Sequence, residues 1–235
     1  MKRGFRVLVA TMAVTAVVGT AAVAAADTST KKKGGNLVGT FKVEAAECSA
    51  AGAPTSGSYF RMLQSGGTLE AGPFLPNGDS TCADTGYTSL APGTDGGLRT
   101  GKFQPDPDPA FDATGNGLAT AIVTPTKFFG VNFAVSTNKT DPESGETDTA
   151  PAIKAKGKKL SGNLEAVSVA YGGQQFNQGA PKPDGALPGN TKVLSGTYNA
   201  KTGAYTIDWS SQIIGGPFDG FTGVWHLEGT FAKSK

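Results

Sequence analysis

Residues 193–231 have the sequence VLSGTYNAKTGAYTIDWSSQIIGGPFDGFTGVWHLEGTF. Apolar and polar residues alternate here, as at Tyr205, Ile207 and Trp209, and a period of two is typical of a half-buried strand. The segment NAKTG at 199–203 predicts a hairpin connection, with its glycine in the left-handed conformation. A second turn is expected at GGPFDG, residues 215–220. This region therefore predicts a three-stranded antiparallel meander.

The same alternation recurs along the rest of the chain, between long loops rich in Gly and Pro. Strands are predicted at residues 37–43, 58–63, 118–123, 127–136, 160–171, 193–198, 204–214 and 223–231. In one of them, Phe129, Val131, Phe133 and Val135 are expected to share a face. The 34 Gly and 14 Pro residues disfavour helices and suit turns. The sequence thus predicts an all-β fold, a single antiparallel β-barrel or β-sandwich of about eight to ten strands with long Gly/Pro-rich loops, and the barrel is preferred.

Three triplets of Gly, Thr and an aromatic residue recur, at residues 39–41, 196–198 and 229–231. Their repetition indicates that similar strands occupy similar positions in the sheet. Pairing of the first strand with the last would close a barrel and remove free edges.

The N-terminus carries basic residues at positions 2, 3 and 6, and residues 7–26 are uncharged and end in small side chains. This layout predicts a secretory signal peptide at 1–26, a flexible leader at 27–35 and one all-β domain at 36–235. A membrane anchor is the alternative, but the segment is rich in Ala and Thr rather than Leu and Ile. We therefore expect a secreted, extracellular protein with no membrane span after signal cleavage.

Charge argues against a nucleic-acid partner. Three of the 21 Lys and Arg residues lie in the predicted signal peptide, which leaves 18 basic residues against 19 acidic ones. A nucleic-acid-binding protein needs a concentrated basic face, and the sequence has none after the predicted leader.

Cys48 and Cys82 are the two cysteines of the chain. In an exported protein, such a pair predicts one structural disulfide. A redox pair or a metal site is the alternative, but the spacing fits neither a CxxC motif nor a zinc site.

The single histidine, His226, shares the polar face of its predicted strand with Glu228. If the hairpin is centred on Phe218, Ser210 opposes His226 and Asp208 opposes Glu228. A serine, a histidine and two carboxylates suggest a hydrolase, but the serine lies in mid-strand and the chain has no G-x-S-x-G motif. The solvated face of a sheet and a ligand or metal contact are the alternatives.

Two loops contain further candidate residues. Asp106, Asp108 and Asp112 are a candidate calcium site, because alternate carboxylates in a turn-rich segment can bind Ca²⁺. The segment does not match an EF-hand, and a rigid solvated loop is the other interpretation. The candidate ligand-binding residues are aromatic side chains and nearby amides in loops: Gln175, Phe176, Asn177, Phe218 and Phe221. Such residues either bind carbohydrate or fix a loop onto the core.

The stretch WSSQIIGGPFDGFTGVWHLEG at 209–229, with FFGVNF at 128–133 and FNQG at 176–179, resembles a family of secreted proteins of actinomycete-type bacteria. The resemblance covers most of the chain after the predicted signal peptide. It implies secretion, and it assigns neither an activity nor functional residues.

We expect a secreted, non-catalytic protein that binds an extracellular ligand or surface, either a glycan or a small apolar molecule. Two long loops on a strand-rich frame favour this function, and no cofactor is expected. An interior cavity of roughly several hundred Å³ would favour a carrier of small molecules. The alternatives are a glycosidase-like hydrolase that uses an acidic pair, Asp208 and Glu228, and a structural coat or matrix protein.

Overall fold

The computed structural model describes residues 35–50 and 52–234, which belong to one compact unit. The predicted signal peptide lies outside these residues, and so does the predicted leader except for Gly35, which begins the first strand. The described residues form strands and loops, with one 3₁₀ turn at Gly216–Phe218 as their only helical element. The predicted all-β class is confirmed.

The main sheet is antiparallel and has eleven strands. Its strands follow the order β1 (Gly35–Leu37), β11 (Ala152–Lys156), β12 (Lys159–Asn163), β15 (Lys192–Tyr198), β16 (Ala204–Gln212), β17 (Thr222–Lys233), β2 (Gly39–Val43) and β8 (Gly97–Arg99). A branch pairs with β17 through β5 (Tyr59–Thr68), which also pairs with β6 (Gly72–Phe74) and β7 (Thr88–Ser89).

Two smaller antiparallel sheets complete the described residues. The four-stranded sheet has the order β14 (Gln174–Asn177), β13 (Val167–Tyr171), β10 (Val131–Thr137) and β9 (Thr126–Phe128). The two-stranded sheet consists of β3 (Glu47–Cys48) and β4 (Pro54–Ser56). Many of the strands have only two or three residues, so residues 35–50 and 52–234 contain 17 strands rather than the expected eight to ten.

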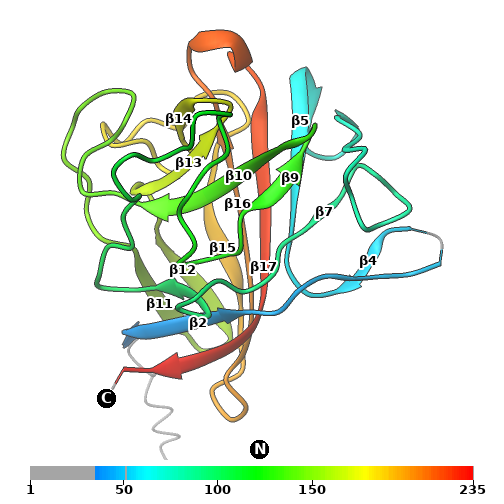
Figure 1. The fold of residues 1–235 in the computed structure, drawn as a ribbon. Coiled ribbons are helices and arrows are strands. Elements are labelled where there is room, and N and C mark those ends of the chain that lie inside the picture. The colour runs from blue at the N-terminus through cyan, green and yellow to red at the C-terminus, as the bar shows by residue number, and fades with distance from the viewer. Residues whose placement is uncertain (1–34, 51, 235) are drawn as a thin grey trace, which may run out of the picture. The chain divides into compact units, whose positions relative to one another are not determined.

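The main sheet curls because the beginning of the described chain pairs with both of its sides. β2 pairs with β17, with Phe41 opposite Phe231, which confirms the predicted pairing of the first strand with the last. β1 pairs with β11, and only Val38 separates β1 from β2. The sheet thus has the form of a curled half-barrel (Figure 1).

The core lies between the curled sheet and the four-stranded sheet. Tyr205, Ile207 and Trp209 are all buried, as the alternation predicts. The Trp209 ring stacks on Trp225 of β17, with centroids 5.5 Å apart and planes 6° apart. Phe133 of β10 contacts Trp225 from the opposite sheet, at a centroid distance of 6.2 Å. Aromatic side chains therefore join the two sheets.

The predicted strand at 118–123 is wrong. Its backbone bonds to a neighbouring loop instead of a sheet, because Gly93 N–H donates to Ile122 O (3.0 Å) and Thr94 N–H donates to Thr120 O (2.8 Å). Ile122 and Val123 are buried nevertheless. The apolar run thus indicated burial correctly and secondary structure incorrectly.

Two other predicted strands are each divided. Residues 127–136 form the β9–β10 hairpin with a two-residue turn at Phe129 and Gly130, so Phe129 does not share a face with Phe133. Residues 160–171 divide between β12 and β13, which belong to different sheets. The segments at 137–158 and 172–190, which lie between predicted strands and are expected to be loops, contain β11 and β14.

The Cys48–Cys82 disulfide is present, as predicted. It connects β3 with the long loop between β6 and β7. This long loop is therefore linked covalently to the N-terminal part of the domain.

Candidate functional site

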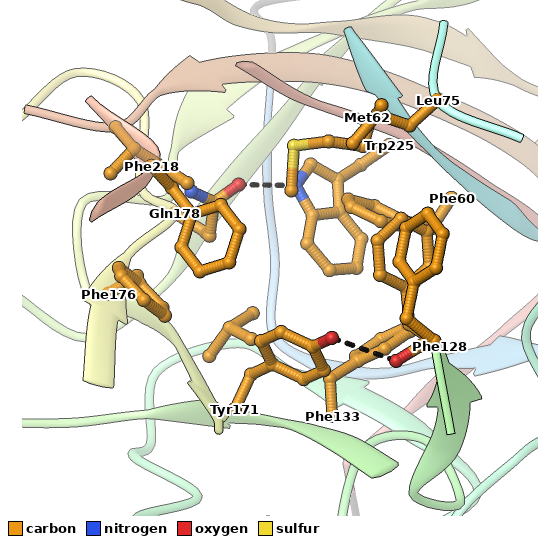
Figure 2. Close-up of a pocket in the computed structure, with 13 residues that line it drawn as sticks. Phe60, Met62, Leu75, Phe128, Phe133, Tyr171, Phe176, Gln178, Phe218 and Trp225 are labelled. Atoms are coloured by element: carbon orange, nitrogen blue, oxygen red, sulfur yellow. Dashed lines mark hydrogen bonds between the residues drawn. The ribbon is translucent and has the colours of Figure 1, made fainter. Parts of the chain in front are cut away.

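A cavity of about 60 Å³ lies between the curled sheet and the four-stranded sheet, and we call it the aromatic cavity (Figure 2). Strands and loops from both sheets supply its wall, which is mostly aromatic and otherwise aliphatic apart from one glutamine. The lining residues are Phe60, Met62, Leu75, Phe128, Phe129, Phe133, Val169, Tyr171, Phe176, Gln178, Ile213, Phe218 and Trp225.

Strand alternation directs those lining side chains that lie on strands inward, and the rings support one another around the cavity. Phe60 of β5 packs on Trp225 with centroids 4.5 Å apart, and on Phe133 with centroids 5.3 Å apart. On the other side, Phe218 of the 3₁₀ turn meets Phe176 of β14 edge to face, at 5.6 Å. The wall is therefore built from rings that fix one another's orientation.

The polar groups of the wall are engaged within the protein. Trp225 Nε1 donates a hydrogen bond to Gln178 Oε1 (3.1 Å), and Tyr171 Oη donates to Phe128 O (2.8 Å), as Figure 2 shows. The cavity thus presents carbon surface, which suits an apolar guest.

Phe129 lies at the rim and is 55% exposed. Its φ is 49° and that of Gly130 is 80°, the backbone of a type I′ hairpin turn. Asn, Asp or Gly is usual at the first position, and an L residue with a large side chain is strained there by about 1 kcal/mol or more. Gly130 N–H donates to Asp79 Oδ2 (2.6 Å), which helps to hold the turn. A bulky ring is thus kept at the rim in spite of its backbone strain.

The structure divides the five predicted ligand-binding residues. Phe176 and Phe218 line the aromatic cavity, and Phe221 contacts Phe218 with centroids 6.1 Å apart. Asn177 is buried with its amide bonded to Asp141 Oδ2, and Gln175 Nε2 donates to Asp106 Oδ2 (2.8 Å). The two amides are therefore occupied within the fold.

Most of the wall was not predicted as a site. Phe60, Phe133 and Trp225 lie on predicted strands, and nothing in their spacing separates a cavity wall from an ordinary core. The available signal was the number of aromatic residues on those strands.

A second group of side chains surrounds His226. Its Nδ1 lies 2.7 Å from Asp208 Oδ1, and its Nε2 lies 3.7 Å from Glu228 Oε2. The ring stacks on Tyr59 of β5, with centroids 4.8 Å apart. Glu228 Oε2 also accepts a hydrogen bond from Gly57 N–H (3.0 Å). This group, the His226 cluster, joins three adjacent strands.

The predicted cross-strand pairs in this hairpin are wrong by two positions. Asp208 opposes His226 rather than Glu228, and Ser210 opposes Val224 rather than His226. Ser210 is buried, and its hydroxyl donates to Asn190 O (2.6 Å). The expected like-charge pair is therefore replaced by a histidine between two carboxylates, and the serine has no histidine beside it.

The His226 cluster predicts a pH-dependent stability. Burial lowers the pKa of His226, but hydrogen bonds and charge from Asp208 and Glu228 outweigh burial, so the pKa lies above the ordinary value. A raised folded-state pKa stabilises the fold fully below the unfolded-state value of about 6.5, and this contribution disappears as pH rises through the folded-state pKa. Asp208 is more than half exposed, so the effect is at most about 1 kcal/mol.

The measurement is urea unfolding of the wild type and of His226→Gln, at pH values from below the unfolded-state pKa of about 6.5 to above the folded-state pKa. We expect the difference in unfolding free energy to be largest at acidic pH and to shrink as the pH rises. Asp208→Asn should weaken the same dependence. A difference that grows with pH would contradict the assignment.

The three aspartates of the predicted calcium site do not share hydrogen-bond partners. Asp106 Oδ2 accepts from Ser136, Asn138 and Gln175, whereas Asp112 binds Thr114 and Asn116 of its own turn. Asp108 is exposed. Over residues 35–50 and 52–234, no three His, Cys, Asp or Glu side chains form a ready metal-ligand group, these three included.

Comparison of the chain with protein-family models, curated proteins and solved structures found no match. None of the helices in the described part of the chain has the length and apolar character needed to span a bilayer.

Proposed function

We propose that this protein binds a small apolar molecule, or the apolar end of a larger one, in the aromatic cavity. The observation that carries the proposal is an apolar cavity of about 60 Å³ between the two sheets, with the exposed Phe129 at its rim. A space lined by carbon offers water few hydrogen-bond partners and therefore favours an apolar guest.

The dimensions and lining of the cavity define the class of ligand. It is smaller than the several hundred Å³ expected for a carrier of large ligands, so one aromatic ring or a short branched alkyl group is a suitable guest. Met62 is flexible enough to adapt to different shapes, and the rings around it are rigid. Recognition would depend on shape and burial rather than on hydrogen bonds.

A glycan is a poorer candidate. Carbohydrate recognition needs amides and aromatic faces that reach solvent, and Asn177 and Phe176 are buried. The hydrolase alternative also lacks support, because Asp208 and Glu228 both face His226 and Ser210 is bonded elsewhere. We place the function outside the cell, in keeping with the disulfide and the predicted signal peptide.

Titration with single-ring apolar compounds such as toluene tests the proposal by calorimetry and by thermal shift. We expect a dissociation constant on the order of 0.1 mM, typical of a ligand with few atoms. The variant Val169→Phe should fill the cavity and reduce affinity by at least about tenfold, while keeping or raising stability.

The matched control is Val193→Phe, which adds the same ring at an exposed position outside the cavity. It should bind like the wild type. Equal affinity of Val169→Phe and Val193→Phe would place the binding elsewhere and refute the proposal.

A further inference from the structure

Residues 138–149 form an irregular hairpin that gathers acidic side chains. Thr140 pairs with Thr147, Asp148 N–H donates to Lys139 O (2.9 Å), and Asp141 N–H donates to Glu146 O (2.8 Å). This register puts Asp141, Glu146 and Asp148 on one face, together with Lys139, which opposes Asp148, because opposite residues of an antiparallel pair point the same way.

Glu165, from the connection between β12 and β13, belongs to the same group. Its Oε1 accepts hydrogen bonds from both the N–H and the hydroxyl of Thr149, the residue after Asp148. We call Asp141, Glu146, Asp148 and Glu165 the acidic cluster.

Within the acidic cluster, Asp148 is unlike its neighbours. It is only 4% exposed, and no donor in the described part of the chain reaches either of its carboxylate oxygens. Asp141, by contrast, accepts three hydrogen bonds at Oδ1, from Glu143 N–H and from the N–H and hydroxyl of Ser144. Glu165 accepts from Thr149 and Asn163.

An ionised carboxylate buried without a donor is strongly unfavourable. The burial of Asp148 and the neighbouring carboxylates of Asp141, Glu165 and Glu146 all disfavour a negative charge at this position. Buried Lys182, which lies near Asp141, is occupied elsewhere, because its Nζ donates to Asn177 O (2.9 Å), Asn177 Oδ1 (3.2 Å) and Ser211 Oγ (2.9 Å). Lys139 is exposed, and among the described residues it donates no hydrogen bond to the Asp148 carboxylate, so the fold leaves the negative charge around Asp148 unmatched.

We propose that Asp148 is a ligand of a divalent cation, calcium, which neutralises the acidic cluster. The ligands in reach are oxygens, which favours a hard cation over zinc or copper. The cluster is not a ready group of three metal-ligand side chains. Asp148 and one neighbouring carboxylate would supply the negative charge. Hydroxyl, carbonyl or water oxygens would complete the coordination of the cation. Calcium tolerates such an irregular shell better than magnesium does, and weak calcium sites are common in extracellular proteins.

Thermal unfolding and calorimetric titration of the purified full chain test this proposal. In 10 mM CaCl₂, compared with chelator, we expect the Tm of the wild type to rise by about 5 to 10 °C, with one calcium per chain. Equal MgCl₂ should give a smaller rise. Asp148→Asn should lose the calcium response, and in chelator it should melt above the wild type, because it removes an unmatched buried charge.

The control is Asp112→Asn, which alters an exposed carboxylate that binds its own turn and should keep the full calcium response. If Asp148→Asn fails to fold, Glu165→Gln provides the comparison and should weaken calcium binding by about tenfold or more. Two results would overturn the proposal: a wild-type Tm unaffected by calcium, even if Asp148→Asn is the more stable protein, or an undiminished response in both cluster variants.

Discussion

The substitution Gly229→Ala is expected to lower the free energy of unfolding by about 3 to 5 kcal/mol. A Cβ atom at this position would lie 2.0 Å from Lys42 O on the paired strand β2. The carbonyl has little freedom to move away, because Tyr205 Oη donates a hydrogen bond to it (2.9 Å). The φ of 154° at Gly229 is also unfavourable for a residue with a side chain.

Urea unfolding at neutral pH measures this loss, with Gly35→Ala as the control. A Cβ at Gly35 would meet nothing within 4 Å, and Gly35 has no positive φ, so its substitution should change stability by less than about 0.5 kcal/mol. If the two variants had closely similar urea midpoints, β17 and β2 would be able to move apart without loss of stability, which would contradict this prediction.

The same close approach explains the repeated Gly-Thr-aromatic triplets. A Cβ at Gly39 would lie 2.2 Å from Ala232 O, and one at Gly196 would lie 2.0 Å from Thr206 O. In each case the backbone of the paired strand passes so close that only glycine leaves room. The repetition in the sequence thus reflects close backbone approach between strands of one sheet rather than a repeated domain.

Alternation predicted the faces of β16 and β17 correctly but not their register. Ile207, Trp209, Trp225 and Leu227 are buried as expected, yet each residue pairs two positions away from the predicted partner. Side-chain faces have a period of two, so a shift by two leaves every face unchanged and the sequence pattern cannot detect it. The 3₁₀ turn at Gly216–Phe218 and its flanking loop set the register, and composition does not fix their geometry.

The error at Phe129 has a different cause. Its alternation with Val131 and Phe133 fits a continuous strand, and only Gly130 hints at a turn. A phenylalanine at φ 49° contradicts local preference, so long-range contacts such as that of Asp79 with the turn must decide the conformation. Local rules thus fail at the rim of the candidate site, where strain is most often functional.

Of the aromatic cavity only Phe176 and Phe218 were predicted as site residues, and the acidic cluster was not predicted at all. The aromatic cavity gathers residues from positions 60 to 225, and its space is a property of packing that no motif encodes. Asp148 lies in a polar stretch expected to be a solvated loop, but the hairpin turns its carboxylate inward. Composition predicts that such a segment is charged, whereas tertiary structure decides whether its charged side chains are exposed to solvent.

Trp225→Ala is the other substitution with a large expected effect. Trp225 separates the aromatic cavity from a second apolar cavity of about 10 Å³, which Trp209 and Leu227 also line. Truncation should join the two cavities and cost about 3 to 5 kcal/mol, the usual loss for a buried tryptophan. It also leaves Gln178 Oε1 without its donor.

Indole should restore part of this stability because it replaces both the missing ring and the missing N–H donor. At about ten times its dissociation constant, a ligand that binds only the folded state adds about 1.4 kcal/mol, or about 3 to 5 °C in Tm for a protein of this size. Indene, which has the same shape without the N–H, should give a smaller rise, because Gln178 Oε1 then stays unpaired.

Leu164→Ala is the control, because Leu164 is fully buried and lines neither cavity. Its loss should be of similar size, about 2 to 5 kcal/mol, and indole should not reverse it. Indole rescue of both variants would indicate general binding to loosened cores, and no rescue of Trp225→Ala would mean that the joined cavity collapses. Selective rescue would establish that this interior holds an apolar guest at a defined position, which is the property that the proposed function requires.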